Sequence, residues 1–155
     1  MAAPFSVSIP VRFADCDPAG IVFYPRYFEM FNALVEDWCA QGLGMPFREM
    51  HVTQRIGLPT VRLETDFVAP SELGETLRAE LAVRRIGGAS LQVALRLLGA
   101  DGGERVRAKV VLVAMDLDAR CAVPLPRALR ERAAAYVVDD AADAADAAGD
   151  AARTD

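Results

Sequence analysis

The chain has few residues of the types that metal and nucleophilic sites usually need. Its 155 residues include one histidine, His51, and three cysteines, Cys16, Cys39 and Cys121. The cysteines are widely and irregularly spaced, so they predict neither a disulfide framework nor a zinc site. Reduced thiols are typical of the cytoplasm. We therefore expect a cytoplasmic protein whose site contains no metal ion or other cofactor.

Positive charge and long apolar runs are also scarce. The net charge of -5 argues against a general nucleic-acid binder, and any anionic ligand must meet a local basic patch. No apolar run approaches the roughly 20 residues needed to cross a bilayer, and the N-terminus lacks the pattern of a signal peptide. The sequence predicts a soluble protein with neither nucleic acid nor membrane as a partner.

The order of sequence patterns predicts an α+β domain. Apolar residues alternate with polar ones from Phe5 to Phe13, which is typical of a half-buried strand, and recur at helical spacing from Tyr27 to Trp38. Four further strand patterns follow at 60–68, 76–86, 91–98 and 105–115, separated by turns rich in glycine. We expect one long helix against an antiparallel meander of about five strands.

A change in composition marks the end of this domain. Residues 1–138 form the predicted domain, which closes with a short helix from Pro126 to Val138. Residues 139–155 are almost entirely alanine and aspartate. Such a tail has too little apolar surface to offset the entropy of ordering, so we predict that it is disordered.

One stretch, DCDPAGIVFYPRYFEMF, places an acidic turn directly before the long helix. The run from Val11 to Tyr27 contains an Asp-x-Asp-Pro-x-Gly-Ile-Val core and resembles the signature of the 4-hydroxybenzoyl-CoA thioesterase family. A weaker resemblance continues through Gly57-x-Pro59 and the strand order to about Met115. It implies the hotdog fold, in which the sheet wraps around the helix, and hydrolysis of an acyl-CoA thioester.

The resemblance also implies roles in this loop. Asp17 matches the family's catalytic carboxylate, as a general base or a nucleophile. Pro18 and Gly20 fix the turn and let its backbone pass close to a ligand. The free backbone N–H groups at the helix start, around Tyr24, are suited to bind the oxyanion. The alternative is a purely structural turn, because aspartate before proline commonly bonds nearby backbone.

Three other residues are expected to be non-catalytic. Asp15 is predicted to brace the loop, and Cys16 to pack into the turn, because no histidine adjoins it as an activating base. Hotdog hydratases would pair a histidine with a carboxylate, which would require His51 to reach the site. We expect His51 at the surface or in a loop, which favours thioester hydrolysis over hydration.

Substrate contacts are predicted at both ends of the acyl-CoA molecule. Gly20, Phe23 and Tyr27 lie close to the expected thioester and favour an aromatic acyl group. Arg84 and Arg85 precede the Gly87-Gly88 turn and are candidates for the CoA phosphates. They would point to opposite faces of a regular strand, so at most one can meet a given phosphate; exposed arginines for solubility are the alternative.

Two alternatives to this function stay open. The chain could be a non-catalytic subunit that binds acyl thioesters, or a thioesterase for short aliphatic acyl-CoA. An exposed sheet edge also predicts assembly, as a homodimer or a dimer of dimers with active sites between subunits.

Overall fold

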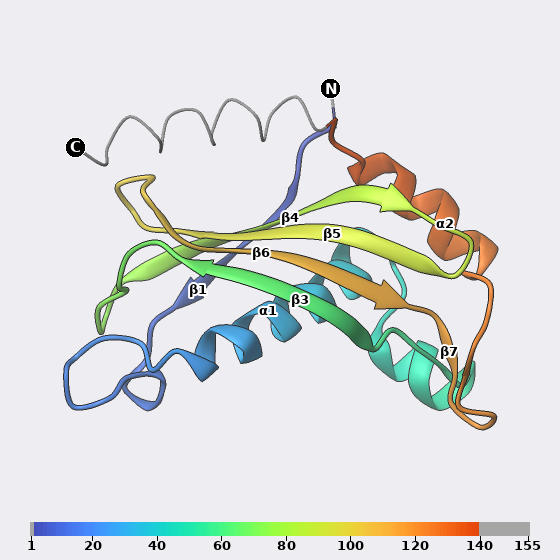
Figure 1. The fold of residues 1–155 in the computed structure, drawn as a ribbon, viewed down its shortest axis with the longest axis horizontal. Helices are drawn as coiled ribbons and strands as arrows, with labels where there is room; N and C mark the ends of the chain where they lie inside the picture. Colours follow the sequence, from blue (N-terminus) through green and yellow to red (C-terminus); the bar gives the residue numbers. More distant parts are fainter. Residues whose placement is uncertain (1, 140–155) are drawn as a thin grey trace.

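A five-stranded antiparallel sheet curves over the long helix α1 (Pro25–Asp37) in the computed structural model, which describes residues 2–139 (Figure 1). The strand order is β1-β4-β5-β6-β3. The strands are β1 (Phe5–Pro10), β3 (Thr60–Phe67), β4 (Thr76–Ile86), β5 (Ser90–Leu98) and β6 (Glu104–Val113). The predicted α+β class, with about five strands around one helix, is confirmed.

The prediction of a simple meander is wrong in one respect. β4, β5 and β6 are consecutive neighbours, but β3 pairs with β6 at the far edge of the sheet and not with β4. The connection between β3 and β4 therefore passes across the end of the sheet. Hydrophobic periodicity identifies strands but does not specify which strands pair, so the sequence pattern gave no sign of this crossing.

Smaller elements gather at the end of the domain that lies opposite the acidic loop (Figure 1). β2 (Ile56–Gly57), β7 (Met115–Asp116) and β8 (Cys121–Ala122) form a second sheet. The short helix α2 (Arg127–Ala133) packs against β4. No helix among residues 2–139 is long and apolar enough to cross a membrane. The predicted tail lies outside the described residues, apart from Asp139.

The first strand is shorter than its alternating pattern predicts. It ends at Pro10, and the Val11 N–H then bonds the Glu75 carbonyl at 2.8 Å, which turns the chain into the acidic loop. Phe13, predicted to be a buried position of this strand, lies in a 3-10 turn and is 84% exposed. Because the chain leaves the sheet at Pro10, the inner face of the sheet does not cover Phe13.

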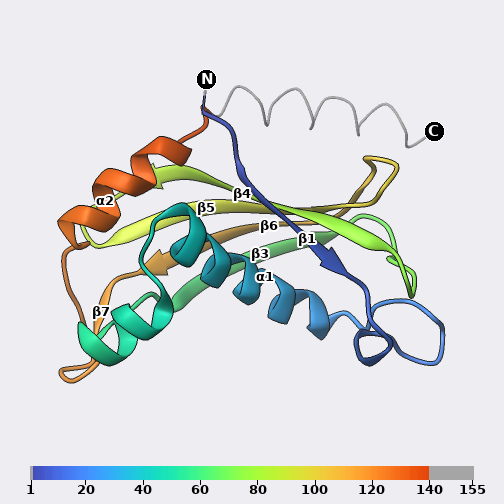
Figure 2. The ribbon, with the colours of Figure 1, turned by 180° about the vertical axis from the view of Figure 1, so that it is seen from behind.

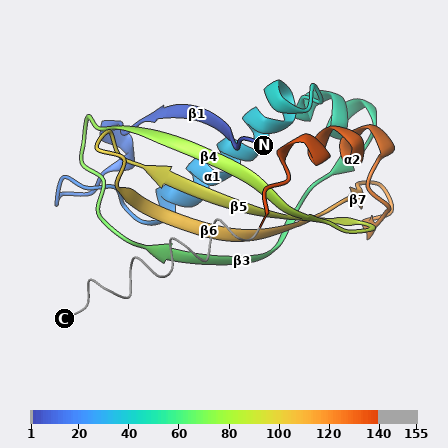
Figure 3. The same ribbon diagram turned by 90° about the horizontal axis from the view of Figure 1, so that it is seen from above.

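The core lies between α1 and the inner face of the sheet, as Figures 2 and 3 show from two sides. The helix buries five side chains: Tyr27, Met30, Phe31, Leu34 and Val35. Full burial of a side chain such as Leu34 contributes about 1.5–3 kcal/mol to folding. The packing fixes the two ends of α1, with the acidic loop at its start and the 43–59 connection beyond its other end.

Candidate active site

The acidic loop is a tight hairpin with Asp17 in its turn. The Gly20 N–H donates to the Asp17 carbonyl at 3.0 Å, and the Asp17 N–H donates to the Ile21 carbonyl at 3.1 Å. Gly20 has a φ of 79°, in the left-handed region that glycine adopts without strain. Pro18 restricts the turn further. Together these features hold the backbone of Asp17 in place.

One oxygen of the Asp17 carboxylate is used to orient the side chain. Oδ1 accepts the Ala19 N–H at 2.9 Å, which is the local bond that a structural turn would make. Among residues 2–139, no donor is hydrogen-bonded to Oδ2. The half-buried carboxylate is therefore oriented by the loop and still has an oxygen available to a water molecule or a thioester carbon.

The neighbours of Asp17 support the loop, as expected. The Asp15 carboxylate accepts the Arg12 N–H at 2.8 Å, and the Asp15 carbonyl accepts the Phe23 N–H at 2.9 Å. The Cys16 thiol donates to the Arg12 carbonyl at 3.6 Å. Partial burial, together with the charges of Asp15 and Asp17, raises the pKa of Cys16, so it is a poor nucleophile. Both predictions for these neighbours are confirmed.

The start of α1 presents a free backbone donor next to this loop. The Arg26 N–H bonds the Phe23 carbonyl at 2.9 Å, and the Tyr27 N–H bonds the Tyr24 carbonyl at 3.1 Å. Within residues 2–139, the Tyr24 N–H has no acceptor. This N–H lies at the positive end of the helix dipole, which favours a developing oxyanion. One short segment thus holds a carboxylate and a backbone N–H without an acceptor.

The aromatic residues of this segment divide into two groups. Phe23 and Tyr24 are 48% and 58% exposed, with ring centroids 5.6 Å apart. Tyr27, predicted to contact substrate, is 4% exposed, and its hydroxyl donates to Ser71 at 2.9 Å. Tyr27 thus lies in the core, where it supports the loop. The sequence pattern did not identify Phe67 of β3, whose ring centroid is 6.0 Å from that of Tyr24.

The 70–75 connection also supports the loop, through backbone hydrogen bonds. The Leu73 N–H bonds the Gly20 carbonyl at 3.1 Å, and the Val22 N–H bonds the Ser71 carbonyl at 2.9 Å. These bonds join the Asp17 hairpin to the crossing between β3 and β4. The crossing that the sequence pattern missed is therefore part of the scaffold of the site.

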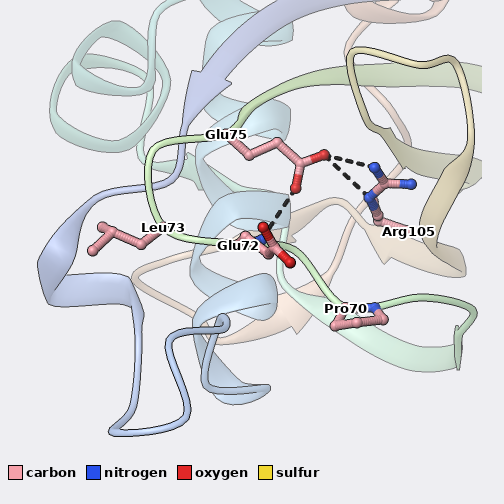
Figure 4. A pocket seen from close by; sticks show the side chains of 5 residues that line it. All are labelled: Pro70, Glu72, Leu73, Glu75 and Arg105. Carbon is pink, nitrogen blue, oxygen red and sulfur yellow. Dashed lines mark hydrogen bonds and ion pairs between the residues drawn. The ribbon is translucent and has the colours of Figure 1, made fainter.

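A largely polar hollow of about 380 Å³ lies in this connection (Figure 4). Arg105 binds Glu75 at 2.7 Å across it, and the Glu72 N–H donates to the other oxygen of Glu75 at 3.1 Å. The hydrogen bond to Glu75 raises the pKa of Arg105. The remaining lining residues are Pro70 and Leu73. An ion pair occupies much of the wall, so this hollow is poorly suited to an apolar acyl group.

A second, largely apolar cavity of about 400 Å³ lies between α1 and the inner face of the sheet. Its walls come from α1, the 47–60 connection, the start of β3, and β5 to β7. The aromatic wall residues are Phe28, Phe31 and Phe47. None of the lining residues in the described part of the chain is an aspartate or glutamate. This cavity has the volume and lining of a site for a small, flat, apolar group.

His51 lines this cavity, which corrects the expectation of a surface or loop residue. It lies in a short π-helical segment, Arg48–Thr53, and is half-buried. Its Nδ1 lies 2.8 Å from the Phe47 carbonyl oxygen, and its ring centroid is 4.7 Å from that of Phe47. The burial arises where this segment packs against β2, which pairs with β7, and no local pattern around His51 encodes that contact.

Arg84 and Arg85 lie at the opposite end of the sheet from Asp17 in the same chain. β4 begins at Thr76, beside the acidic loop, and Arg85 follows nine residues later, about 30 Å along a strand. A β-bulge between Val83 and Arg85 breaks the alternation that we expected. Arg84 bonds the carbonyls of residues 138 and 139 at 3.4 Å, whereas Arg85 is exposed.

Comparison with known proteins identifies the family. The model of the thioesterase-like superfamily matches residues 11–133. The chain belongs to this superfamily. A 1,4-dihydroxy-2-naphthoyl-CoA hydrolase from Thermosynechococcus vestitus is 29% identical to this thioesterase over 117 residues, 75% of this chain and 79% of the relative. A 4-hydroxybenzoyl-CoA thioesterase from Pseudomonas sp. is 29% identical over 54% of this chain and 60% of the relative.

Solved structures share the fold of this thioesterase. A 1,4-dihydroxy-2-naphthoyl-CoA thioesterase from Synechocystis superposes with a TM-score of 0.78 at 22% identity, covering 85% of this chain and 96% of that one. The D17N mutant of a 4-hydroxybenzoyl-CoA thioesterase gives 0.77 at 24% identity, covering 84% and 98%. The predicted family, the hotdog fold and the enzyme class, an acyl-CoA thioester hydrolase, are confirmed.

Proposed function

We propose that this thioesterase hydrolyses aromatic acyl-CoA esters, with Asp17 as the catalytic carboxylate. The observation on which this rests is the pairing of a loop-oriented carboxylate, which keeps one oxygen available, with the free Tyr24 N–H at the start of α1. The Tyr24 N–H would stabilise the negative charge that develops on the thioester oxygen. No histidine is needed in this arrangement.

Two routes to the products use these groups. As a general base, Asp17 accepts a proton from water, and the resulting hydroxide attacks the thioester carbon. The carbon–sulfur bond then breaks, and CoA leaves as a thiolate that takes up a proton. As a nucleophile, Asp17 attacks the carbon itself, and water later hydrolyses the mixed anhydride. Either route yields the free acid and CoA, with the same oxyanion donor.

The acyl group needs a cavity that the loop does not offer within one chain. The apolar cavity begins at Phe28, and the Phe67 ring packs against both Phe28 and Tyr24 of the loop, with centroid distances of 6.3 Å and 6.0 Å. Asn32, deeper in the cavity, is about 12 Å further along α1 than Tyr24. Within one copy, most of the cavity therefore lies away from Asp17 and the Tyr24 N–H, which supports a site shared between copies.

Pairing of two copies through β3 would bring these parts together. β3 is an edge strand with no buried residue, and Val61 and Phe67 are 59% and 52% exposed. Two-fold antiparallel pairing of β3 with its copy would set the Phe67 end of one strand beside the Thr60 end of the other. Phe67 adjoins the loop, and Thr60 lines the cavity. Each Asp17 would then serve the cavity of the second copy, in a homodimer or a dimer of dimers.

The cavity favours an aromatic acyl group over an aliphatic one. Phe28, Phe31 and Phe47 can stack on a flat ring, which is worth about 0.5–1.5 kcal/mol beyond the area buried. The two relatives from Thermosynechococcus and Pseudomonas, named for hydroxynaphthoyl and hydroxybenzoyl esters, agree with this choice. A short aliphatic acyl group would fill less of the cavity and gain less from it.

A panel of acyl-CoA esters, with free thiol as the readout, tests this proposal. We expect higher kcat/KM for benzoyl-CoA and phenylacetyl-CoA than for acetyl-CoA or palmitoyl-CoA. Asp17→Asn should fold but lose about 10² or more in kcat. Asp101→Asn is the control, because the Asp101 carboxylate also accepts a backbone N–H two residues on, from Gly103 at 2.9 Å.

Three results would contradict the proposal. Unchanged turnover in folded Asp17→Asn would exclude its catalytic role, and preference for acetyl-CoA would exclude the aromatic acyl group. Absence of turnover with the whole panel would favour a non-catalytic binding subunit.

A further inference from the structure

His51 is held in a fixed tautomer and orientation. Its Nδ1 lies 2.8 Å from the Phe47 carbonyl oxygen, and a carbonyl oxygen can only accept. Nδ1 must therefore bear the ring proton, and in the neutral imidazole Nε2 is left as an acceptor. The contact with the Phe47 ring adds a second restraint on the imidazole plane.

The free nitrogen of His51 lies at the wall of the apolar cavity. Nε2 faces Gly57, where an added Cβ would lie 3.6 Å from Nε2 and 2.9 Å from a methyl carbon of Leu117. His51, Gly57 and Leu117 all line the cavity. Within the described part of the chain, no donor is hydrogen-bonded to Nε2. The cavity wall thus presents an oriented acceptor without a partner.

An acyl group that fills this cavity would displace water from that acceptor. A buried acceptor left without a donor costs about 1–3 kcal/mol, so a ligand that supplies a donor at this point is favoured over one that does not. The other polar lining side chains, Asn32 and Thr60, can donate as well as accept. In the neutral imidazole with its proton on Nδ1, Nε2 of His51 can only accept, so it distinguishes a donor from an acceptor.

We propose that His51 is a specificity residue that selects acyl groups bearing a hydroxyl, by accepting its hydrogen bond at Nε2. The inference rests on the proposed function, because it assumes that the acyl group occupies this cavity. It goes further than that function, because it assigns recognition of a hydroxyl on the acyl group to one atom, Nε2 of His51. A hydroxyaryl thioester would stack on the phenylalanine rings and donate its hydroxyl to His51.

Matched substrate pairs test this assignment. The pairs are each of 2-, 3- and 4-hydroxybenzoyl-CoA against benzoyl-CoA, and 1,4-dihydroxy-2-naphthoyl-CoA against 2-naphthoyl-CoA. We expect the wild-type enzyme to prefer at least one hydroxylated ester by about tenfold or more in kcat/KM. His51→Phe should reduce that preference to less than twofold by slowing the hydroxylated ester alone. His51→Gln, which keeps an acceptor, should restore part of it.

Val52→Ala is the control, since Val52 is the next residue, is 61% exposed and does not line the cavity. It should keep the full preference. The inference is overturned if the wild-type enzyme shows no preference in any pair, or if His51→Phe slows both members of a pair equally. Failure of the proposed function looks different: no ester in these pairs is hydrolysed, or hydrolysis does not depend on Asp17. Circular dichroism of each variant checks that it is folded.

Discussion

The two ends of α1 differ in what they can contribute to a thioesterase site. The acidic loop lies at the start of the helix, and the apolar cavity lies towards its other end. The loop has an oriented carboxylate and a free N–H, but the hollow beside it is largely polar and holds an ion pair. The cavity is lined mainly by aromatic and aliphatic side chains, and among residues 2–139 no carboxylate lines it. Neither end alone combines a carboxylate with an apolar cavity, which supports our proposal that the chemistry and the acyl selectivity meet across two copies.

Apart from loss of the Asp17 carboxylate itself, disruption of the proposed interface between two copies should give the largest effect. Val61→Asp places a charge on the exposed edge of β3, where pairing with a second copy would bury it at a cost of several kcal/mol. We expect the dimer to dissociate at micromolar concentration, and kcat/KM to fall more than tenfold. Light scattering and an activity assay over the same dilution series measure the two together.

The matched control is Val52→Asp, which places the same charge on a valine of similar exposure, 61% against 59%, away from the strand edge. It should alter neither mass nor activity. A Val61→Asp monomer with full activity would show that one copy holds a complete site, and our division of the site between two copies would be wrong.

A change to the loop backbone that keeps the Asp17 carboxylate should have a smaller effect. Gly20 and Gly102 both have a φ of 79° and open space where a Cβ would lie. Alanine at either position should therefore cost about 1–2 kcal/mol of stability through backbone strain alone. Only Gly20→Ala should also lower kcat, by about tenfold, because small displacements of a catalytic group are costly. Denaturant unfolding and steady-state kinetics separate the two effects; equal kcat values would remove the link between Gly20 and Asp17.

The two ends also differ in how far the sequence predicts them. The loop is contiguous, so its motif identified Asp17, Gly20 and the free N–H of Tyr24, and local turn chemistry accounts for the bracing by Asp15. Burial is a tertiary property. The helical spacing of Tyr27 gave no means of telling that its hydroxyl would be bonded to Ser71 in the core.

The cavity was not predicted because it is assembled from segments far apart in the chain. It needs the pairing of β3 with β6, which places Thr60 opposite Leu112, and it needs the 47–60 connection to fold back on α1. A lone His51 without a surrounding motif gives no signal of a cavity wall. The β-bulge between Val83 and Arg85 likewise broke the alternation expected for Arg84 and Arg85, since strand periodicity assumes regular pairing.

The smallest effect should come from the two arginines at the cavity end. Arg85 pairs with Gln92 of β5. The residue next to Gln92, Leu91, pairs with Leu112, which lines the cavity. Arg85 therefore lies at the cavity end of the sheet, where the CoA phosphates would pass. An exposed charge contact is worth about 0.2–1 kcal/mol, so Arg85→Ala should raise KM for the CoA ester less than about fivefold, with kcat unchanged. Salt should weaken this effect, and the matching N-acetylcysteamine thioester, which lacks the phosphates, should show none. Arg84→Ala should instead lower stability, because Arg84 bonds the carbonyls of residues 138 and 139. An equal rise in KM for both thioesters would mean that Arg85 supports the fold and that other residues bind the phosphates.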